Sequence, residues 1–128
     1  MASDEHRIAA RYAEPGEEIC AVFSAYTGGG FGRRVVGVTN LRLILIKSGY
    51  WSVSDRGLLW ADPLDQVALK DSYEVWLTNG MNTGNAYLTI RRADQSTLRL
   101  NPRDSFIGRT GSAASSIEAF YSLIPGRY

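Results

Sequence analysis

Hydrophobic and polar residues alternate along much of the chain with the period of two that is typical of half-buried β-strands. The first alternating segment covers residues 19–26. Its two faces would carry the sets Ile19, Ala21, Phe23, Ala25 and Cys20, Val22, Ser24, Tyr26. Because a free cysteine inside a strand behaves as a small hydrophobic residue, we expect Cys20 to be buried.

Six further strands are expected between segments rich in glycine, asparagine and proline. They cover residues 33–39, 41–47, 58–69 with a bend at Asp62-Pro63, 73–78, 86–92 and 97–101. Residues 41–47 are apolar on both faces, which predicts a central place in the sheet. Residues 27–32 and 79–85 are expected to be loops, because several glycines in a ladder would cost backbone entropy.

Helical spacing is found only near the two ends of the chain. Residues 4–14 predict a short helix that Ser3 or Asp4 would cap and that Pro15-Gly16 would end. After Gly111, Ser112 can cap a second helix. The expected buried stripe of this helix is Ile117, Phe120, Tyr121 and Ile124. The pattern therefore predicts one antiparallel β domain whose open end is covered by a C-terminal helix.

Three segments carry a resemblance to a known family: Gly16-Glu17-Glu18-Ile19, Val38-Thr39-Asn40-Leu41-Arg42-Leu43-Ile44-Leu45 and Trp60-Ala61-Asp62-Pro63-Leu64-Asp65-Gln66-Val67. In this order, and followed by a final helix, they resemble the bacterial pleckstrin-homology-like (PH-like) domains over nearly the whole chain. The resemblance implies a mainly β (α+β) fold, a bent antiparallel barrel of about seven strands with a C-terminal capping helix. Residues 16–128 would form this domain and residues 1–15 an N-terminal helical extension.

Composition narrows the classes of function. The 14 Lys and Arg residues nearly balance the 13 Asp and Glu residues, which argues against nucleic acid as a partner. No apolar run approaches the ~20 residues of a membrane-spanning helix, and the first residues lack a signal-peptide core. We therefore expect a cytoplasmic protein, with peripheral contact at the inner membrane face as an alternative. A single cysteine, Cys20, excludes an internal disulfide and a cysteine zinc cluster.

No catalytic or metal-binding constellation emerges from the residues. His6 is the only histidine, and the sequence places no nucleophile beside it. The acidic residues between Asp62 and Glu74 lack the spacing of a calcium loop. The glycine segment over residues 28–32 is not followed by Gly-Lys-Ser/Thr, as a phosphate loop would be. We predict that the protein is not an enzyme and needs no cofactor or metal.

Two binding hypotheses remain. The first is a module for protein–protein interaction or self-association through open sheet edges, with Phe31, Tyr50 and Trp51 as candidate partner contacts. The alternative is a peripheral module that binds an anion or an anionic lipid headgroup through a basic patch near the first hairpin loop. Its candidate residues are Arg33, Arg34 and Arg42. Ordinary surface charge, paired between neighbouring strands, would also explain these arginines.

Overall fold

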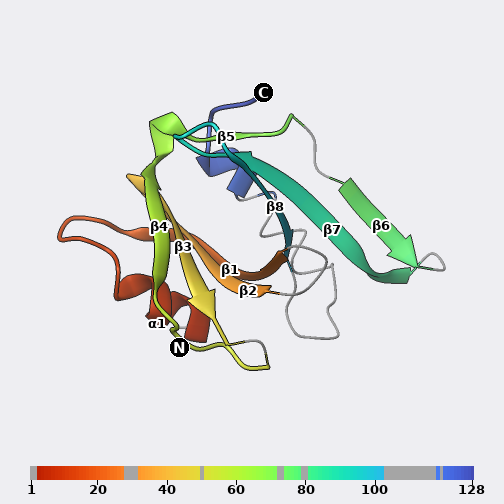
Figure 1. Ribbon diagram of the computed structural model, residues 1–128, viewed down its shortest axis with the longest axis horizontal. Helices are drawn as coiled ribbons and strands as arrows, with labels where there is room; N and C mark the ends of the chain where they lie inside the picture. The colour runs from red at the N-terminus through yellow and green to blue at the C-terminus, as the bar shows by residue number, and fades with distance from the viewer. Residues whose placement is uncertain are drawn as a thin grey trace.

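The computed structural model describes residues 3–27, 32–49, 51–71, 74–78, 81–102, 118 and 120–128 (Figure 1). Their elements are α1 (Asp4–Ala10), β1 (Ile19–Thr27), β2 (Gly32–Thr39), β3 (Arg42–Ser48), β4 (Leu58–Pro63), η2 (Leu64–Gln66), β5 (Ala68–Leu69), β6 (Glu74–Thr78), β7 (Met81–Arg91) and β8 (Thr97–Pro102). The protein is therefore mainly β with few helices, as the alternating pattern predicts.

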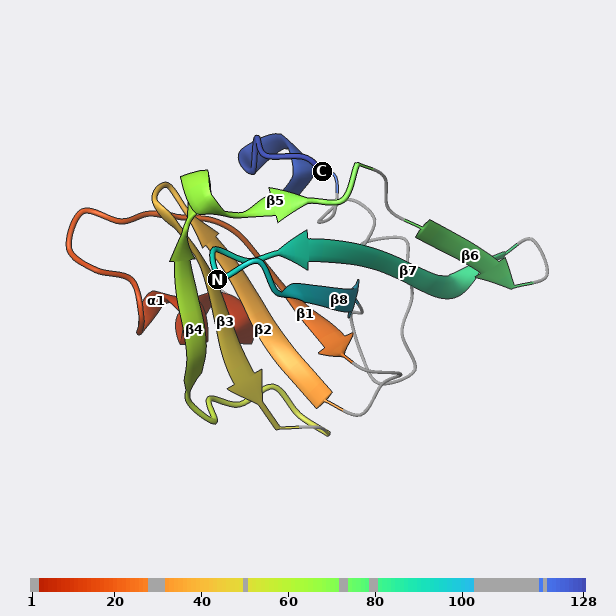
Figure 2. The same ribbon diagram turned by 45° about the horizontal axis from the view of Figure 1, so that its top comes forward.

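The strands pair antiparallel in the order β4-β3-β2-β1-β8-β7-β5, and β6 pairs with β7 outside this path. Strands β1–β4 form one layer, and β5, β7 and β8 run across it as a second layer (Figure 2). Among the described strands, no ladder joins β4 to β5, so the sheet is open at that corner. The 3-10 turn η2 carries the chain from one layer to the other.

Two hydrophobic clusters lie on opposite faces of β1–β3. The larger cluster fills the space between the two layers and includes Phe23, Val36 and Leu45. The smaller one lies under α1, where Ile8 and Ala9 pack with Val35, Ile44 and Ile46. All four residues from Leu43 to Ile46 are buried, so β3 is covered on both faces as predicted, although it lies second from the free edge at β4 and not at the centre of the sheet.

The C-terminal residues cover one side of the larger cluster. Glu118 and residues 120–123 are helical. Phe120 and Ile124 are fully buried, and the Phe120 ring packs edge-on against Phe23 with 5.4 Å between ring centroids. Tyr121 is partly exposed, and its hydroxyl donates to the Lys70 carbonyl at 2.8 Å. These positions confirm the predicted stripe for Phe120, Tyr121 and Ile124, whereas Ile117 lies outside the described residues.

Three details differ from the sequence-based predictions. Strand β7 begins at Met81 rather than after residue 85, because it pairs with β6 at Thr78↔Met81 as well as from Trp76↔Asn85 onward; Gly84 lies in the irregular stretch between these pairs. Helix α1 ends at Ala10, although Ser3 caps it as expected by accepting from the His6 amide at 3.1 Å. Residues 11–12 form a turn instead of continuing the helix.

The third difference concerns Cys20, which is exposed and not buried. A β-bulge lies between the pairs Ile19↔Thr39 and Ala21↔Val38, so Cys20 is an extra residue in β1. The bulge breaks the simple alternation of the two faces. Ile19 therefore packs against the α1-side cluster together with Val22, and not with Phe23 as the period of two predicted.

Candidate anion-binding site

A basic cleft of about 640 Å³ lies where β2 begins and β3 ends, at the lower end of these strands in Figure 2. The residues that line it are Gly32, Arg33, Arg34, Lys47, Ser48, Gly49 and Arg56. The register of the β2–β3 hairpin places Arg33 opposite Ser48 and Arg34 opposite Lys47. Arg56 reaches the cleft because its amide donates to the Lys47 carbonyl at 2.8 Å.

The four cations of this cleft lack a neutralising carboxylate among the described residues. Within the described part of the chain, no ion pair joins Arg33, Arg34, Lys47 or Arg56 to a carboxylate. Like charges directly opposite in a sheet, such as Arg34 and Lys47, are destabilising. Clustered cations in a cleft raise the local concentration of anions, so an anionic ligand would relieve this repulsion.

Arg33 is the most unusual residue of the cleft, because only 5% of it is exposed. Its Nη2 donates to Ser24 Oγ at 3.4 Å, and its Cζ lies 5.9 Å from the centroid of the Tyr26 ring. Its buried Nε has no hydrogen-bond partner among the described residues. Burial of an incompletely bonded cation is costly, and an oxyanion is the natural partner of a guanidinium.

Arg34 lies on the other face of β2, as expected for consecutive strand residues. Its Nη1 donates to the Arg33 carbonyl at 3.1 Å and lies over Gly32. A Cβ at position 32 would come within 2.9 Å of that nitrogen, so glycine makes room for the guanidinium. Burial lowers the pKa of Arg34 below its ordinary value, although arginine keeps its charge in proteins.

The chain after β3 folds back beside the cleft through serine side chains. The Gly49 amide donates to Ser54 Oγ at 3.0 Å, and the Ser54 amide donates to Ser48 Oγ at 3.1 Å. A Cβ on Gly49 would lie 2.9 Å from the Ser52 carbonyl oxygen, which favours glycine there. Trp51 is 76% exposed, as predicted for this loop, and Tyr50 lies outside the described residues. Phe31, the third predicted contact residue, also lies outside them.

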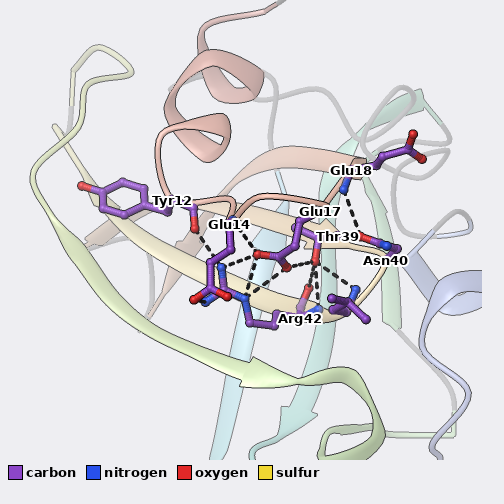
Figure 3. A network of polar contacts seen from close by, with 8 residues as sticks. Tyr12, Glu14, Glu17, Glu18, Thr39, Asn40 and Arg42 are labelled. Atoms are coloured by element: carbon purple, nitrogen blue, oxygen red, sulfur yellow. Dashed lines mark hydrogen bonds and ion pairs between the residues drawn. The ribbon is translucent and has the colours of Figure 1, made fainter.

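Arg42 does not take part in the cleft, although the sequence analysis grouped it with Arg33 and Arg34. It begins β3 and pairs with Pro63 on β4, at the opposite end of the β2–β3 hairpin. Figure 3 shows it bound to Glu17: Arg42 Nη2 lies 2.6 Å from Oε1, and Nε lies 3.1 Å from both carboxylate oxygens. Nη2 also donates to the Tyr12 carbonyl at 2.8 Å.

The Arg42–Glu17 pair is a structural element that anchors the segment between α1 and β1. Glu17 also accepts from Thr39 Oγ1, and its side chain is only 1% exposed. The hydrogen bonds from Arg42 hold the pKa of Glu17 at about 2, well below its usual range. An ion pair thus accounts for Arg42, although Glu17 precedes β1 and does not lie on a strand next to β3.

Lys47 and Arg56 were not among the predicted site residues. Lys47 lies opposite Arg34 because the two-residue loop of the hairpin is Asn40-Leu41; the predicted turn at Thr39-Asn40 would have put residue 47 opposite Gly32 instead. Arg56 carries no comparable signal, since its position depends on how residues 51–57 fold back on β3.

Other kinds of site find little support in the described residues. No group of three metal-ligating His, Cys, Asp or Glu side chains gathers there. In the same part of the chain, no helix has the length and apolar character needed to cross a bilayer. Comparison with known proteins finds no family model that matches this chain and no curated protein significantly similar to it.

Proposed function

We propose that the protein is a non-catalytic PH-like module whose basic cleft binds a phosphate-bearing anion, such as the headgroup of an anionic lipid. The observation that carries the proposal is the buried Arg33, whose Nε has no partner among the described residues. Arg34, Lys47 and Arg56 line the same cleft and add further positive charge. This arrangement favours anion binding over the interpretation that the arginines are ordinary surface charge.

The PH-like assignment is supported by the order of the strands. The segment Val38–Leu45 spans the turn between β2 and β3, and Trp60–Val67 spans β4 and η2, in the order that the resemblance implies. Strands β5, β7 and β8 cross the first four, and the final helical residues cover the core between the layers. A bent barrel with its corner at η2 is the architecture we propose.

The test of the cleft is Arg33→Met, which keeps a long apolar stem and removes the guanidinium. We expect affinity for inorganic phosphate, and for phosphatidylcholine vesicles that contain phosphatidylserine, to fall roughly tenfold to a hundredfold, because a charged hydrogen-bonding partner is lost. The free energy of unfolding should stay level or rise, since a buried, incompletely bonded charge is removed. NMR titration, vesicle co-sedimentation and urea denaturation measure these effects.

Arg99→Met is the matched control, because Arg99 is exposed on β8, is not a lining residue of the cleft, and its loss changes the net charge equally. Binding by this variant should match the wild type within about twofold. Equal binding by wild type and Arg33→Met, or no binding by the wild type, would refute the proposed function.

A second candidate function, self-association, is favoured by the free edge of β4. This strand ends the sheet order and exposes Leu58 and Leu59 by 43% and 44%. Exposed Arg56 precedes the strand and exposed Asp65 follows it. Antiparallel pairing of two β4 strands would therefore bring opposite charges together. The bulge at Leu59 and the proline at position 63 shorten the usable edge, so we rank this function second.

Self-association predicts that Leu59→Lys converts an oligomer into a monomer, because a lysine on an edge strand opposes pairing. Sedimentation velocity measures the change, with Tyr128→Lys as a control at an exposed aromatic residue outside β4. A wild type that sediments as a monomer at high concentration would exclude this function.

A further inference from the structure

Two neighbouring residues of opposite charge face opposite sides of the loop before β4. Arg56 lines the basic cleft. Asp55 instead faces α1, where it lines a separate hollow of about 350 Å³ together with Arg11 and other residues. Arg56 therefore lies at the basic cleft, whereas the carboxylate of Asp55 lies on the other side of the loop.

Three donors hold the Asp55 carboxylate on the α1 side. Tyr12 Oη donates to Oδ1 at 2.7 Å, Arg11 Nη1 donates to Oδ2 at 3.2 Å, and the Gly57 amide donates to Oδ1 at 2.9 Å. The hydrogen bond from Tyr12 is the main reason that the pKa of Asp55 lies below its ordinary value. The side chain is only 16% exposed, so these contacts account for most of its surroundings.

The early end of α1 makes this arrangement possible. The chain turns after Ala10, and the Tyr12 amide donates to the Ala9 carbonyl at 3.0 Å. The Tyr12 ring packs against the α1-side cluster, which leaves its hydroxyl directed at Asp55. A helix continued to Glu14, as the sequence pattern predicted, would place residue 12 differently.

A released Asp55 would have nearby cations to bind. Arg56 is its neighbour in the chain. The Lys47 amide donates to the Gly57 carbonyl at 2.9 Å, so Lys47 lies beside the same loop. A carboxylate that paired with either of them would compete with an external anion for the cleft.

We propose that Tyr12 and Arg11 are positioning residues that hold Asp55 away from the basic cleft and so keep the cleft free for an anion. This inference rests on the proposed anion-binding function. On this proposal, the N-terminal helical segment contributes to anion binding as well as covering the sheet.

The first test is a cycle of Tyr12→Phe, Asp55→Asn and the double variant, titrated with inorganic phosphate by NMR. Phenylalanine keeps the ring packing and removes only the hydroxyl. We expect Tyr12→Phe to weaken phosphate binding roughly threefold to tenfold, because the freed carboxylate competes for the cleft. Asp55→Asn and the double variant should bind at least as well as the wild type, because no carboxylate remains to compete. Tyr128→Phe, an exposed tyrosine near β5, is the control and should bind as the wild type.

A purely structural role for Tyr12 gives a different result. If the hydroxyl only stiffens the loop, the double variant stays as weak as Tyr12→Phe, and the positioning role is overturned. Wild-type affinity in Tyr12→Phe overturns it as well.

The second readout needs no bound anion. Hydrogen exchange of the Arg56 Hε proton should slow in Tyr12→Phe, where Asp55 can pair with Arg56, and return to the wild-type rate in the double variant. If the wild type binds no phosphate but exchange changes in this way, the anion-binding function fails and the positioning role stands. If phosphate binds through Arg33 but exchange is the same in every variant, the positioning role fails.

Discussion

Replacement of Phe120 by alanine is expected to lower the free energy of unfolding by about 3–5 kcal/mol, the usual cost of truncating a core aromatic residue. Phe120 is fully buried, and its ring meets Phe23 edge-on at an interplanar angle of 83°. It joins the C-terminal helical residues to β1 across the larger cluster, so the cavity left behind would lie in the middle of the core. Urea denaturation measures the loss.

The control is Glu118→Ala, because Glu118 belongs to the same helical segment and is exposed. Its effect should stay within about 0.5 kcal/mol, the range of ordinary surface substitutions. A loss of similar size for Phe120→Ala would contradict the packing of the final helix against the sheet.

A loss of about 3 kcal/mol at neutral pH is expected for Arg42→Met, near the lower limit for breaking a buried ion pair. The substitution leaves the Glu17 carboxylate, which is 1% exposed, without its main partner. The Thr39 hydroxyl and the Glu14 amide would still donate to it, but neither carries a charge. Arg7→Met is the control, since its partner Asp4 is exposed and such pairs contribute less than about 1 kcal/mol.

The destabilisation caused by Arg42→Met should decrease as pH falls. A carboxylate whose pKa is lowered by folding stabilises the folded state above its unfolded pKa, and this stabilisation disappears as pH falls through the folded pKa. For Glu17, the window runs from its ordinary range near 4.5 down to about 2. The difference in unfolding free energy between wild type and Arg42→Met should therefore shrink across this window. A difference that is constant with pH would show that the lost packing of Arg42, and not the ion pair, sets the effect.

Sequence patterns sufficed for the strands whose side chains alternate without interruption. Residues 43–46, which are apolar on both faces, were correctly predicted to be a fully covered strand, but β3 lies beside the edge strand β4 and not in the centre of the sheet. The errors fall where a long-range contact outweighs a local preference. Pairing with β6 extends β7 through Gly84, and a bulge at Cys20 moves Ile19 to the other face of β1.

The same contrast holds for the candidate site. Arg33 and Arg34 stand out in the sequence because they follow a glycine-rich loop, and the structure brings them together. Arg42 looks equivalent in sequence, yet the antiparallel hairpin carries it to the opposite end of the sheet. The near-zero net charge also hides the cleft, because composition averages over cations and carboxylates that the fold separates.

The exposed thiol created by the bulge in β1 has a practical consequence. Cys20 is the only cysteine of the chain, and its Sγ lies 3.6 Å from the Glu18 carbonyl oxygen, at the end of the sheet away from the basic cleft. Without a reducing agent, two molecules could join through an intermolecular disulfide and imitate a native dimer in sedimentation experiments. With the thiol kept reduced, the same residue offers a single attachment point for a fluorophore that leaves the cleft unoccupied.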